Sequence, residues 1–316
     1  MLIAGPNLTI DRTLAIDELR PGEVLRFDSV VVTPGGKGLN VARAARALGH
    51  PAVLVSLLPG RTGEAAAALI ADEGIELHAI PYHGELRSSA IIQERGGRTT
   101  VLNEPGPPVG EADWAAYERM VGERLGAHGV LVCSGSVPPG SPPDAYGRLA
   151  RLAEAAGVTS LVDAAGETLV GALGAAPSLV TPNLAEAEGA LGRARGAQAV
   201  LSAEDARPRA LAAAEALVHQ GARSVVVTAD AEGAAVLAAG APAEWIPAPR
   251  VAEVRNPIGA GDVFASALAA ALERGEPLAL AARAGVAAAA ASVESPTAGV
   301  LDPERMRALV EAIPRG

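Results

Sequence analysis

Residues 256–262 read Asn-Pro-Ile-Gly-Ala-Gly-Asp and bring a turn of small residues and one carboxylate to the start of a long alanine-rich segment. Without bulky side chains, the backbone N–H groups of Gly259, Ala260 and Gly261 can converge on an anion at a helix N-terminus, where the helix dipole favours negative charge. Asp262 would then lie beside a bound phosphate. Because an aspartate that opens a helix is most often only a capping residue, the stretch predicts an anion site only together with other motifs.

A second glycine motif lies near the N-terminus. Residues 34–42 read Pro-Gly-Gly-Lys-Gly-Leu-Asn-Val-Ala and run into a helical pattern that is expected over residues 42–48. The glycines permit close approach of the backbone to a ligand, and Lys37 and Asn40 offer polar contacts from the same loop. Lys37 is followed by glycine rather than by Ser or Thr, so the motif is not the phosphate loop of the P-loop ATPases.

Together the two motifs resemble the signatures of the ribokinase-like (PfkB) carbohydrate kinases, in the order and at the separation that this family shows. The resemblance extends over essentially the whole chain, with further landmarks at residues 7–11, 103–107, 134–140, 163, 166–167 and 182–186. Within the family the chain looks most like the branch that phosphorylates hexose monophosphates, which includes tagatose-6-phosphate kinase and 1-phosphofructokinase.

The middle of the chain alternates β-rich runs with helical segments. Strands are expected at residues 130–133, 160–163, 179–181 and 224–228, and helices at 143–156 and 206–220. This rhythm predicts a mostly parallel sheet with helices on both faces and ligands at the carboxyl ends of its strands, where Asp163 and Thr228 fall. The resemblance implies a ribokinase-like three-layer α/β/α fold, with residues 1–316 forming a single kinase domain.

Two regions, residues 12–32 and 88–102, carry β-branched residues without intervening helices. We expect them to form the antiparallel strands of a small β-sheet lid, although periodicity alone also allows them to extend the main sheet. In the resembling family such a lid covers the sugar and often pairs with that of a second subunit. The resemblance therefore implies a homodimer formed through the lid.

Composition limits the classes of function. The chain of 316 residues is 49% hydrophobic, which suffices for a large core, but only 2% aromatic. With few aromatic side chains for base stacking and a net charge of −10, nucleic acid is not expected as a partner. No uncharged apolar stretch has spanning character and no signal sequence is evident, so we expect a cytoplasmic protein without membrane contact. Five histidines and the single Cys133 show no zinc-site spacing.

The chemistry expected from the motifs is phosphoryl transfer from ATP. A substrate hydroxyl is a poor nucleophile at neutral pH, so Asp262 is the candidate general base, and the amides of Gly259, Ala260 and Gly261 would stabilise the charge that develops on the transferred group. Mg²⁺ needs few protein oxygens beside the nucleotide phosphates, so Asn183 and Glu186 could serve it, Glu186 through water. The alternative, which does not exclude this role, is a helix N-cap with its capping-box partner, since Asn183 and Glu186 stand three apart.

On the acceptor side, the resemblance implies that four residues bind the sugar hydroxyls, namely Asp11, Gly35, Gly36 and Asn40. For an acceptor that already carries phosphate, Arg87 is the expected anchor because a guanidinium binds phosphate in a bidentate manner, and Lys37 would assist.

The nucleotide side departs from the pattern of the family. Thr181 stands where lysine is common before Pro-Asn, and residues 228–233, which read Thr-Ala-Asp-Ala-Glu-Gly, carry Asp230 where the nucleotide turn usually has glycine. Thr228 and Gly233 remain the candidate nucleotide contacts. These departures leave two alternatives open: a kinase of an unphosphorylated sugar or nucleoside, and a sugar-binding sensor without catalysis.

Overall fold

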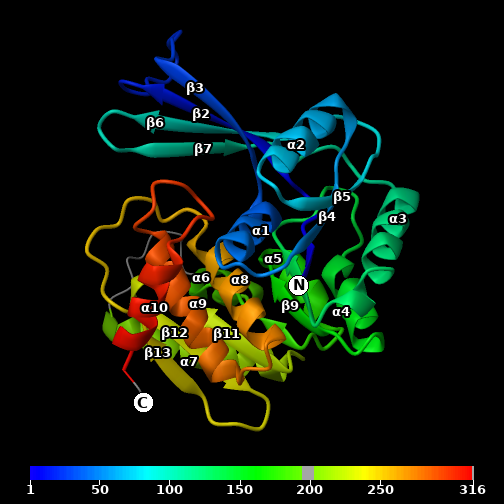
Figure 1. Ribbon diagram of the computed structural model, residues 1–316, viewed down its shortest axis with the longest axis vertical. Coiled ribbons are helices and arrows are strands. Elements are labelled where there is room, and N and C mark those ends of the chain that lie inside the picture. Colours follow the sequence, from blue (N-terminus) through cyan, green and yellow to red (C-terminus); the bar gives the residue numbers. More distant parts are fainter. Residues whose placement is uncertain (194–202, 315–316) are drawn as a thin grey trace.

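The computed structural model describes residues 1–193 and 203–314, and it consists of a large sheet between helices and a smaller sheet that projects from this body (Figure 1). In spatial order the large sheet contains β13 (Glu244–Pro247), β12 (Gly233–Ala238), β11 (Ser224–Thr228), β10 (Leu179–Val180), β9 (Thr159–Asp163), β8 (Val130–Ser134), β1 (Leu2–Ala4), β4 (Val53–Leu57) and β5 (Glu76–Ile80). The strands from β11 to β5 are parallel, and β12 and β13 are antiparallel to their neighbours.

Helices cover both faces of this sheet. One face packs against α1 (Lys37–Ala47), α2 (Gly60–Asp72), α8 (Ala260–Glu273), α9 (Leu278–Ser292) and α10 (Pro303–Ala312). The other packs against α3 (Glu111–Gly122), α4 (Ala145–Ala155), α5 (Gly166–Leu173), α6 (Leu184–Ala190) and α7 (Ala203–His219). Along β8, Val130 and Val132 enter the first core and Leu131 and Cys133 the second, which is the alternation of a strand buried on both sides. The expected ribokinase-like three-layer fold is confirmed.

No helix over residues 1–193 and 203–314 combines the length and the apolar character that crossing a membrane requires. The alanine-rich helix α9 is packed in the first core.

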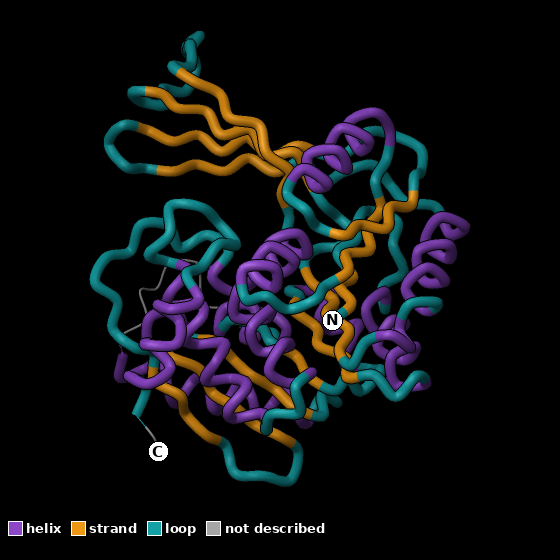
Figure 2. The backbone as a smooth tube through the Cα atoms, in the orientation of Figure 1, coloured by secondary structure: helices purple, strands orange, loops and turns teal. Residues whose placement is uncertain are grey.

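The small sheet has the strand order β3 (Ser29–Gly35), β2 (Thr9–Ile16), β6 (Ser88–Glu94) and β7 (Thr99–Asn103). It stands apart from the body as two hairpins, so the alternative that these strands extend the main sheet is wrong (Figure 2). The expectation of an all-antiparallel lid is also wrong, because β2 and β6 pair in parallel. β2, which follows β1, and β6, which follows β5, both run away from the body in the same direction. Their antiparallel hairpin partners, β3 and β7, run back toward it.

The first helix begins at Lys37, five residues earlier than its hydrophobic pattern predicts. Gly36, with φ of 112°, forms the N-cap, and the stretch that looked like a loop is the first helical turn. This early start is possible because Gly38 lies against the backbone of Gly5 beyond β1, where there is no room for a side chain. The helix N-terminus is thereby brought to the carboxyl edge of the sheet.

The contact between Gly38 and Gly5 leads to a stability prediction. A Cβ added to Gly38 would lie 2.7 Å from Cα of Gly5, and neither backbone can yield easily. We expect Gly38→Ala to lower the free energy of unfolding by about 1–3 kcal/mol, as measured by denaturant titration. The matched control is Gly189→Ala in α6, where an added Cβ meets nothing within 4 Å. Equal stability of both variants and the parent would contradict the prediction.

Candidate active site

The two glycine motifs meet at the buried carboxylate of Asp262. Asp262 is the third residue of α8, its exposed fraction is 4%, and its Oδ2 accepts a hydrogen bond of 2.8 Å from Nδ2 of Asn40 on α1. The amide of Asn40 is fixed in this orientation because its Oδ1 accepts a hydrogen bond of 3.1 Å from Nη1 of Arg43. The carboxylate of Asp262 therefore accepts a hydrogen bond from a fixed donor, the side-chain amide of Asn40. The sequence could not have revealed this contact.

The loop before α8 is held by Asn256. Its Oδ1 accepts a hydrogen bond of 2.9 Å from the amide of Ile258, and its Nδ2 donates one of 3.1 Å to the carbonyl of Pro296. Gly259 then adopts a left-handed conformation with φ of 83° and caps the helix, and the amide of Ala260 makes only a long bond of 3.4 Å to Pro257. The turn thus presents a helix N-terminus, whose partial positive charge favours an anion.

Burial and neighbouring charges set the protonation of Asp262. Its pKa is raised to about 7, first by burial and then by the carboxylate of Asp163, although the ammonium of Lys37 and the hydrogen bond from Asn40 act in the opposite direction. A carboxyl with a pKa near neutrality is well matched to the task of a general base.

Lys37 lies among three carboxylates. Its Nζ is 3.4 Å from Oδ2 of Asp163 and 3.7 Å from Oε1 of Glu186, and Asp262 contributes a further favourable charge. Asp163 in turn accepts a hydrogen bond of 3.1 Å from Oγ of Ser134, at the ends of the neighbouring strands β9 and β8. The charge of Asp163, the largest influence, raises the pKa of Lys37 well above its ordinary value, so its ammonium stays charged.

A cavity of about 300 Å³ opens beside Lys37 under the lid. Its wall includes Asn7, Lys37, Arg87, Asn103, Ser134, Ser136, Thr168 and Glu186. Arg87 is fixed by backbone carbonyls, since it donates to Asn7 at 3.0 Å, Leu8 at 3.1 Å and Glu104 at 3.3 Å. The structure therefore brings Lys37 and Arg87 to one cavity, as the sequence predicts, and adds Glu186 to it.

Asp11 and the glycines of the first motif lie at the base of the lid. The carboxylate of Asp11 rests against the backbone of Gly35, where a Cβ would come within 2.0 Å of its Oδ2. Burial raises the pKa of Asp11, while the charges of Arg87 and Arg43 oppose this. Asp11 does not line the 300 Å³ cavity, but its carboxylate interacts electrostatically with Arg87, which does line it.

A second cavity of about 540 Å³ lies at the α8 N-terminus. Its lining includes Ala260 and Gly261 of that N-terminus, the turn residues Thr228, Asp230 and Gly233, and the apolar side chains of Phe264, Val254, Val286 and Val293. Apolar side chains for a base and a helix N-terminus for phosphates suit a nucleotide. The turn survives with Asp230 at a φ of 47°, in the left-handed region that aspartate tolerates better than most residues.

Asn183 and Glu186 form a capping box at the start of α6. Oδ1 of Asn183 accepts from the amide of Glu186 at 2.9 Å, and Oε2 of Glu186 accepts from the amide of Asn183 at 2.9 Å. The predicted alternative, a helix N-cap with its capping-box partner, is thus confirmed. The second carboxylate oxygen of Glu186, Oε1, remains directed to Lys37.

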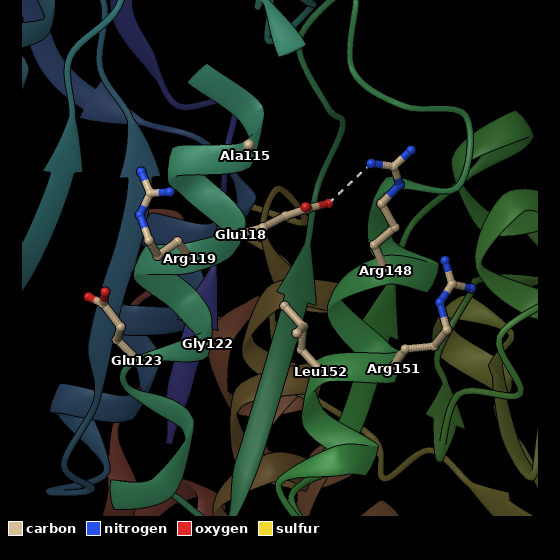
Figure 3. A pocket seen from close by; sticks show the side chains of 8 residues that line it. All are labelled: Ala115, Glu118, Arg119, Gly122, Glu123, Arg148, Arg151 and Leu152. Atoms are coloured by element: carbon tan, nitrogen blue, oxygen red, sulfur yellow. Dashed lines mark ion pairs between the residues drawn. The ribbon is translucent and has the colours of Figure 1, made fainter. Parts of the chain in front are cut away.

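A hollow of similar volume, about 540 Å³, lies between α3 and α4 on the opposite face of the sheet (Figure 3). Nη1 of Arg148 lies 3.7 Å from Oε1 of Glu118 across it, whereas Arg119 and Glu123 point away from Arg148. Its charges do not converge on a common point, so it lacks the features of a site.

Arg43 contacts the candidate site but was not predicted from the sequence. Besides Asn40 it binds the carbonyl of Pro34 at 2.7 Å and both oxygens of Glu73. Its position three residues after Asn40, on the same helical face, was the available signal.

A three-layer α/β/α fold, a helix N-terminus that opens to a cavity, and a buried carboxyl with a pKa near 7 in the first turn of that helix are the features of a phosphotransferase of the ribokinase-like type. The family model described as pfkB family carbohydrate kinase matches residues 7–305 of this chain. The chain is 33% identical over 313 residues to the 1-phosphofructokinase of Xanthomonas campestris pv. campestris, covering 97% of this chain and 95% of that protein. It is 30% identical over 295 residues to the ATP-dependent 6-phosphofructokinase isozyme 2 of Mycobacterium tuberculosis H37Rv, covering 92% of this chain and 83% of that protein.

Among solved structures, phosphofructokinase-2 of Escherichia coli in complex with potassium superposes with a TM-score of 0.87 and 27% identity, covering 98% of each chain. The chain belongs to the pfkB family of carbohydrate kinases. It is accordingly an enzyme that transfers a phosphoryl group to an alcohol.

The raised pKa of Asp262 predicts the pH dependence of activity. If Asp262 is the general base, as the sequence predicts, it must be deprotonated to accept a proton, and kcat/KM should then fall about tenfold per pH unit as the pH drops below about 7. Asn40→Ala removes a donor that favours the carboxylate, and the acid limb should then move to higher pH. A pH–rate profile measures both. Gln93→Ala, on an exposed position of β6, is the control, and an unmoved limb in Asn40→Ala would contradict the assignment.

Proposed function

We propose that this chain is an ATP- and Mg²⁺-dependent kinase of a ketohexose monophosphate, with Asp262 as the general base. The single observation that carries the proposal is the buried Asp262, whose pKa of about 7 and position at the α8 N-terminus suit proton transfer beside a phosphoryl group. Residues 1–316 would act as one kinase domain, with the small sheet as the lid over the sugar.

In the proposed reaction the acceptor hydroxyl attacks the γ-phosphorus of ATP in line. Asp262 accepts the hydroxyl proton as the new O–P bond forms and the bond to the β-phosphate breaks. The amides of Gly259, Ala260 and Gly261 meet the negative charge that develops on the equatorial oxygens, an effect that is usually larger than that of the base. Gly261 supports this role because nothing lies within 4 Å of a Cβ added there, so the helix end is open to the cavity.

The phosphorylated end of the acceptor would lie in the 300 Å³ cavity, and its hydroxyls would extend beyond this cavity to the base of the lid. Arg87 would anchor the phosphate that the acceptor already carries, because its guanidinium is held in place by three backbone carbonyls. Asp11, Asn40 and the backbone of Gly35 and Gly36 would bind the sugar hydroxyls. The relatives named as 1-phosphofructokinase and 6-phosphofructokinase support a ketohexose phosphate as the class of acceptor.

The donor would lie in the 540 Å³ cavity, with its base against apolar side chains such as Phe264 and with Thr228 and Gly233 beside the phosphates. The carboxylates of Glu186 and Asp163 fit Mg²⁺, which prefers hard oxygen ligands, and Asn183 positions Glu186 through the capping box. The described residues contain no group of three or more His, Cys, Asp or Glu that could hold a metal by itself, so most ligands would be water and nucleotide oxygens. Mg²⁺ would there neutralise part of the polyphosphate charge.

A coupled ADP-release assay tests the function. We expect turnover with ATP and Mg²⁺ on fructose 1-phosphate, fructose 6-phosphate or tagatose 6-phosphate, and none with Asp262→Asn. Arg87→Ala should raise KM for the phosphorylated acceptor by about 10²-fold, since a charge-assisted bidentate contact is lost, with a smaller effect on KM for ATP. Arg95→Ala, on an exposed lid residue, is the control.

Other outcomes of the same assay identify the alternatives. Activity only on fructose, ribose or adenosine would assign the chain to kinases of unphosphorylated acceptors. Absence of turnover, with a thermal shift on adding sugar phosphate, would support a sensor.

The lid supports a homodimer. Its strands expose apolar side chains, among them Val31 at 54% and Leu102 at 58%, with Val30, Val32 and Val101 beside them. Such a patch is typical of an interaction surface, and a second lid is the natural partner. We expect a dimer by light scattering at micromolar concentration, and a monomer after Val31→Glu. Val170→Glu, at a 49% exposed site on α5, should leave the dimer intact. A monomeric parent protein would contradict the prediction.

A further inference from the structure

This chain contains a single lysine. Of its 26 lysine and arginine residues 25 are arginine, and the exception is Lys37. At its other basic positions, including surface sites where the two residues serve equally well, the chain carries arginine. The lone lysine lies in the active site, which indicates that a compact ammonium is used there for a property that a guanidinium lacks.

The contacts of Lys37 leave its ammonium free to move. Its two ion pairs are long, 3.4 Å to Asp163 and 3.7 Å to Glu186, and the side chain is 40% exposed to the cavity beneath the lid. Only its stem is confined, since it follows the N-cap Gly36 and its Cβ lies 3.3 Å from the position of a Cβ on Gly135. The head group can therefore shift without moving the helix.

Arg87, the other cation of this cavity, is bound differently. Its guanidinium donates to the carbonyls of Asn7, Leu8 and Glu104, so it is a fixed group suited to a fixed phosphate. The ammonium of Lys37 lines the acceptor cavity and pairs with Asp163 and Glu186, and the charge of Asp262 also acts on it, so it lies within electrostatic reach of the proposed base. The two cations are therefore suited to different phosphates.

We propose that Lys37 is a catalytic residue whose ammonium contacts the phosphoryl group during its transfer, rather than the phosphate that the acceptor already carries. This inference rests on the proposed function. In the transition state the ammonium moves away from Asp163 and Glu186 to the equatorial oxygens of the γ-phosphoryl group. Lys37 gives up no proton, because the hydroxyl proton goes to Asp262 and ADP leaves with the electron pair of the broken O–P bond.

Arginine should be unable to replace Lys37. A guanidinium forms parallel hydrogen bonds to a carboxylate, and beside Asp163 and Glu186 it would be held in that bidentate geometry. An ammonium pairs with each carboxylate as a point charge and exchanges one partner for another easily. The retention of lysine in an otherwise arginine-only chain follows from this difference.

The first test separates kcat from KM. With the phosphorylated hexose that the parent enzyme turns over, we expect Lys37→Met to lower kcat by about 10²-fold while KM for the acceptor changes by less than about threefold, because the contact exists mainly in the transition state. We expect Lys37→Arg to keep the fold and to lose most of this kcat as well. Arg119→Met, which removes an exposed charge from α3, is the control.

The second test has a readout that a structural ion pair would not affect. In Lys37→Ala, ethylammonium added to the assay should restore part of kcat in a saturable manner, whereas ethanol should not. The complex with ADP, aluminium fluoride and acceptor, which mimics the phosphoryl group in transfer, should bind at least tenfold more weakly in Lys37→Met, with unchanged affinity for acceptor alone by calorimetry.

The outcomes distinguish this inference from the proposed function. If the parent enzyme turns over no phosphorylated hexose, both are wrong. If it does, and Lys37→Met raises KM for the acceptor with kcat unchanged, Lys37 is an acceptor anchor and the inference is overturned. Parent-like kinetics in Lys37→Met, or in Lys37→Arg, would overturn it as well.

Discussion

The hydrogen bond between Asn40 and Asp262 is the contact on which the site depends, because it joins two helix N-termini that are 222 residues apart in sequence. Burying a carboxylate is costly unless donors compensate for the lost water. Here one amide donor and the open end of α8 compensate only in part, and the pKa of Asp262 remains near neutrality. A fully satisfied carboxylate would be more stable but a poorer base. The hydrogen bond from Asn40 thus fits the proposed role of Asp262 as a base that takes up and releases a proton.

The candidate site is acidic, although both substrates of the proposed reaction are polyanions. Asp163, Glu186 and Asp262 surround one ammonium, so the protein groups alone leave an excess of negative charge. Such an arrangement is favourable only where further positive charge joins it, from the helix N-terminus, from Arg87 and from a cation that accompanies the nucleotide. The acidic cluster is therefore better understood as a place for exchangeable cations than as a surface for phosphate.

Much of the fold could be predicted from the sequence, because strand and helix periods are local. The parallel sheet, the lid regions and the place of Asp262 on α8 followed from such patterns. The start of α1 and the parallel pairing of β2 with β6 did not, since both depend on contacts between distant segments, Gly38 with Gly5 and one outgoing strand with another. In the candidate site, the residue types were predictable, but the orientation of Asn40 by Arg43 and the position of Lys37 between carboxylates were not.

The two halves of the site are carried by different parts of the molecule. Asp262, Asp163 and the donor cavity belong to the large sheet and its helices, whose packing fixes them rigidly. Asp11, Arg87 and Asn103 come from the strands of the small sheet or the residues just before them. In the proposed enzyme, changes in the lid could therefore alter which sugar is bound without disturbing Asp262. Because the carboxylate of Asp11 fits only against Gly35, the base of the lid is itself constrained, and variation in the acceptor should concentrate farther along the strands.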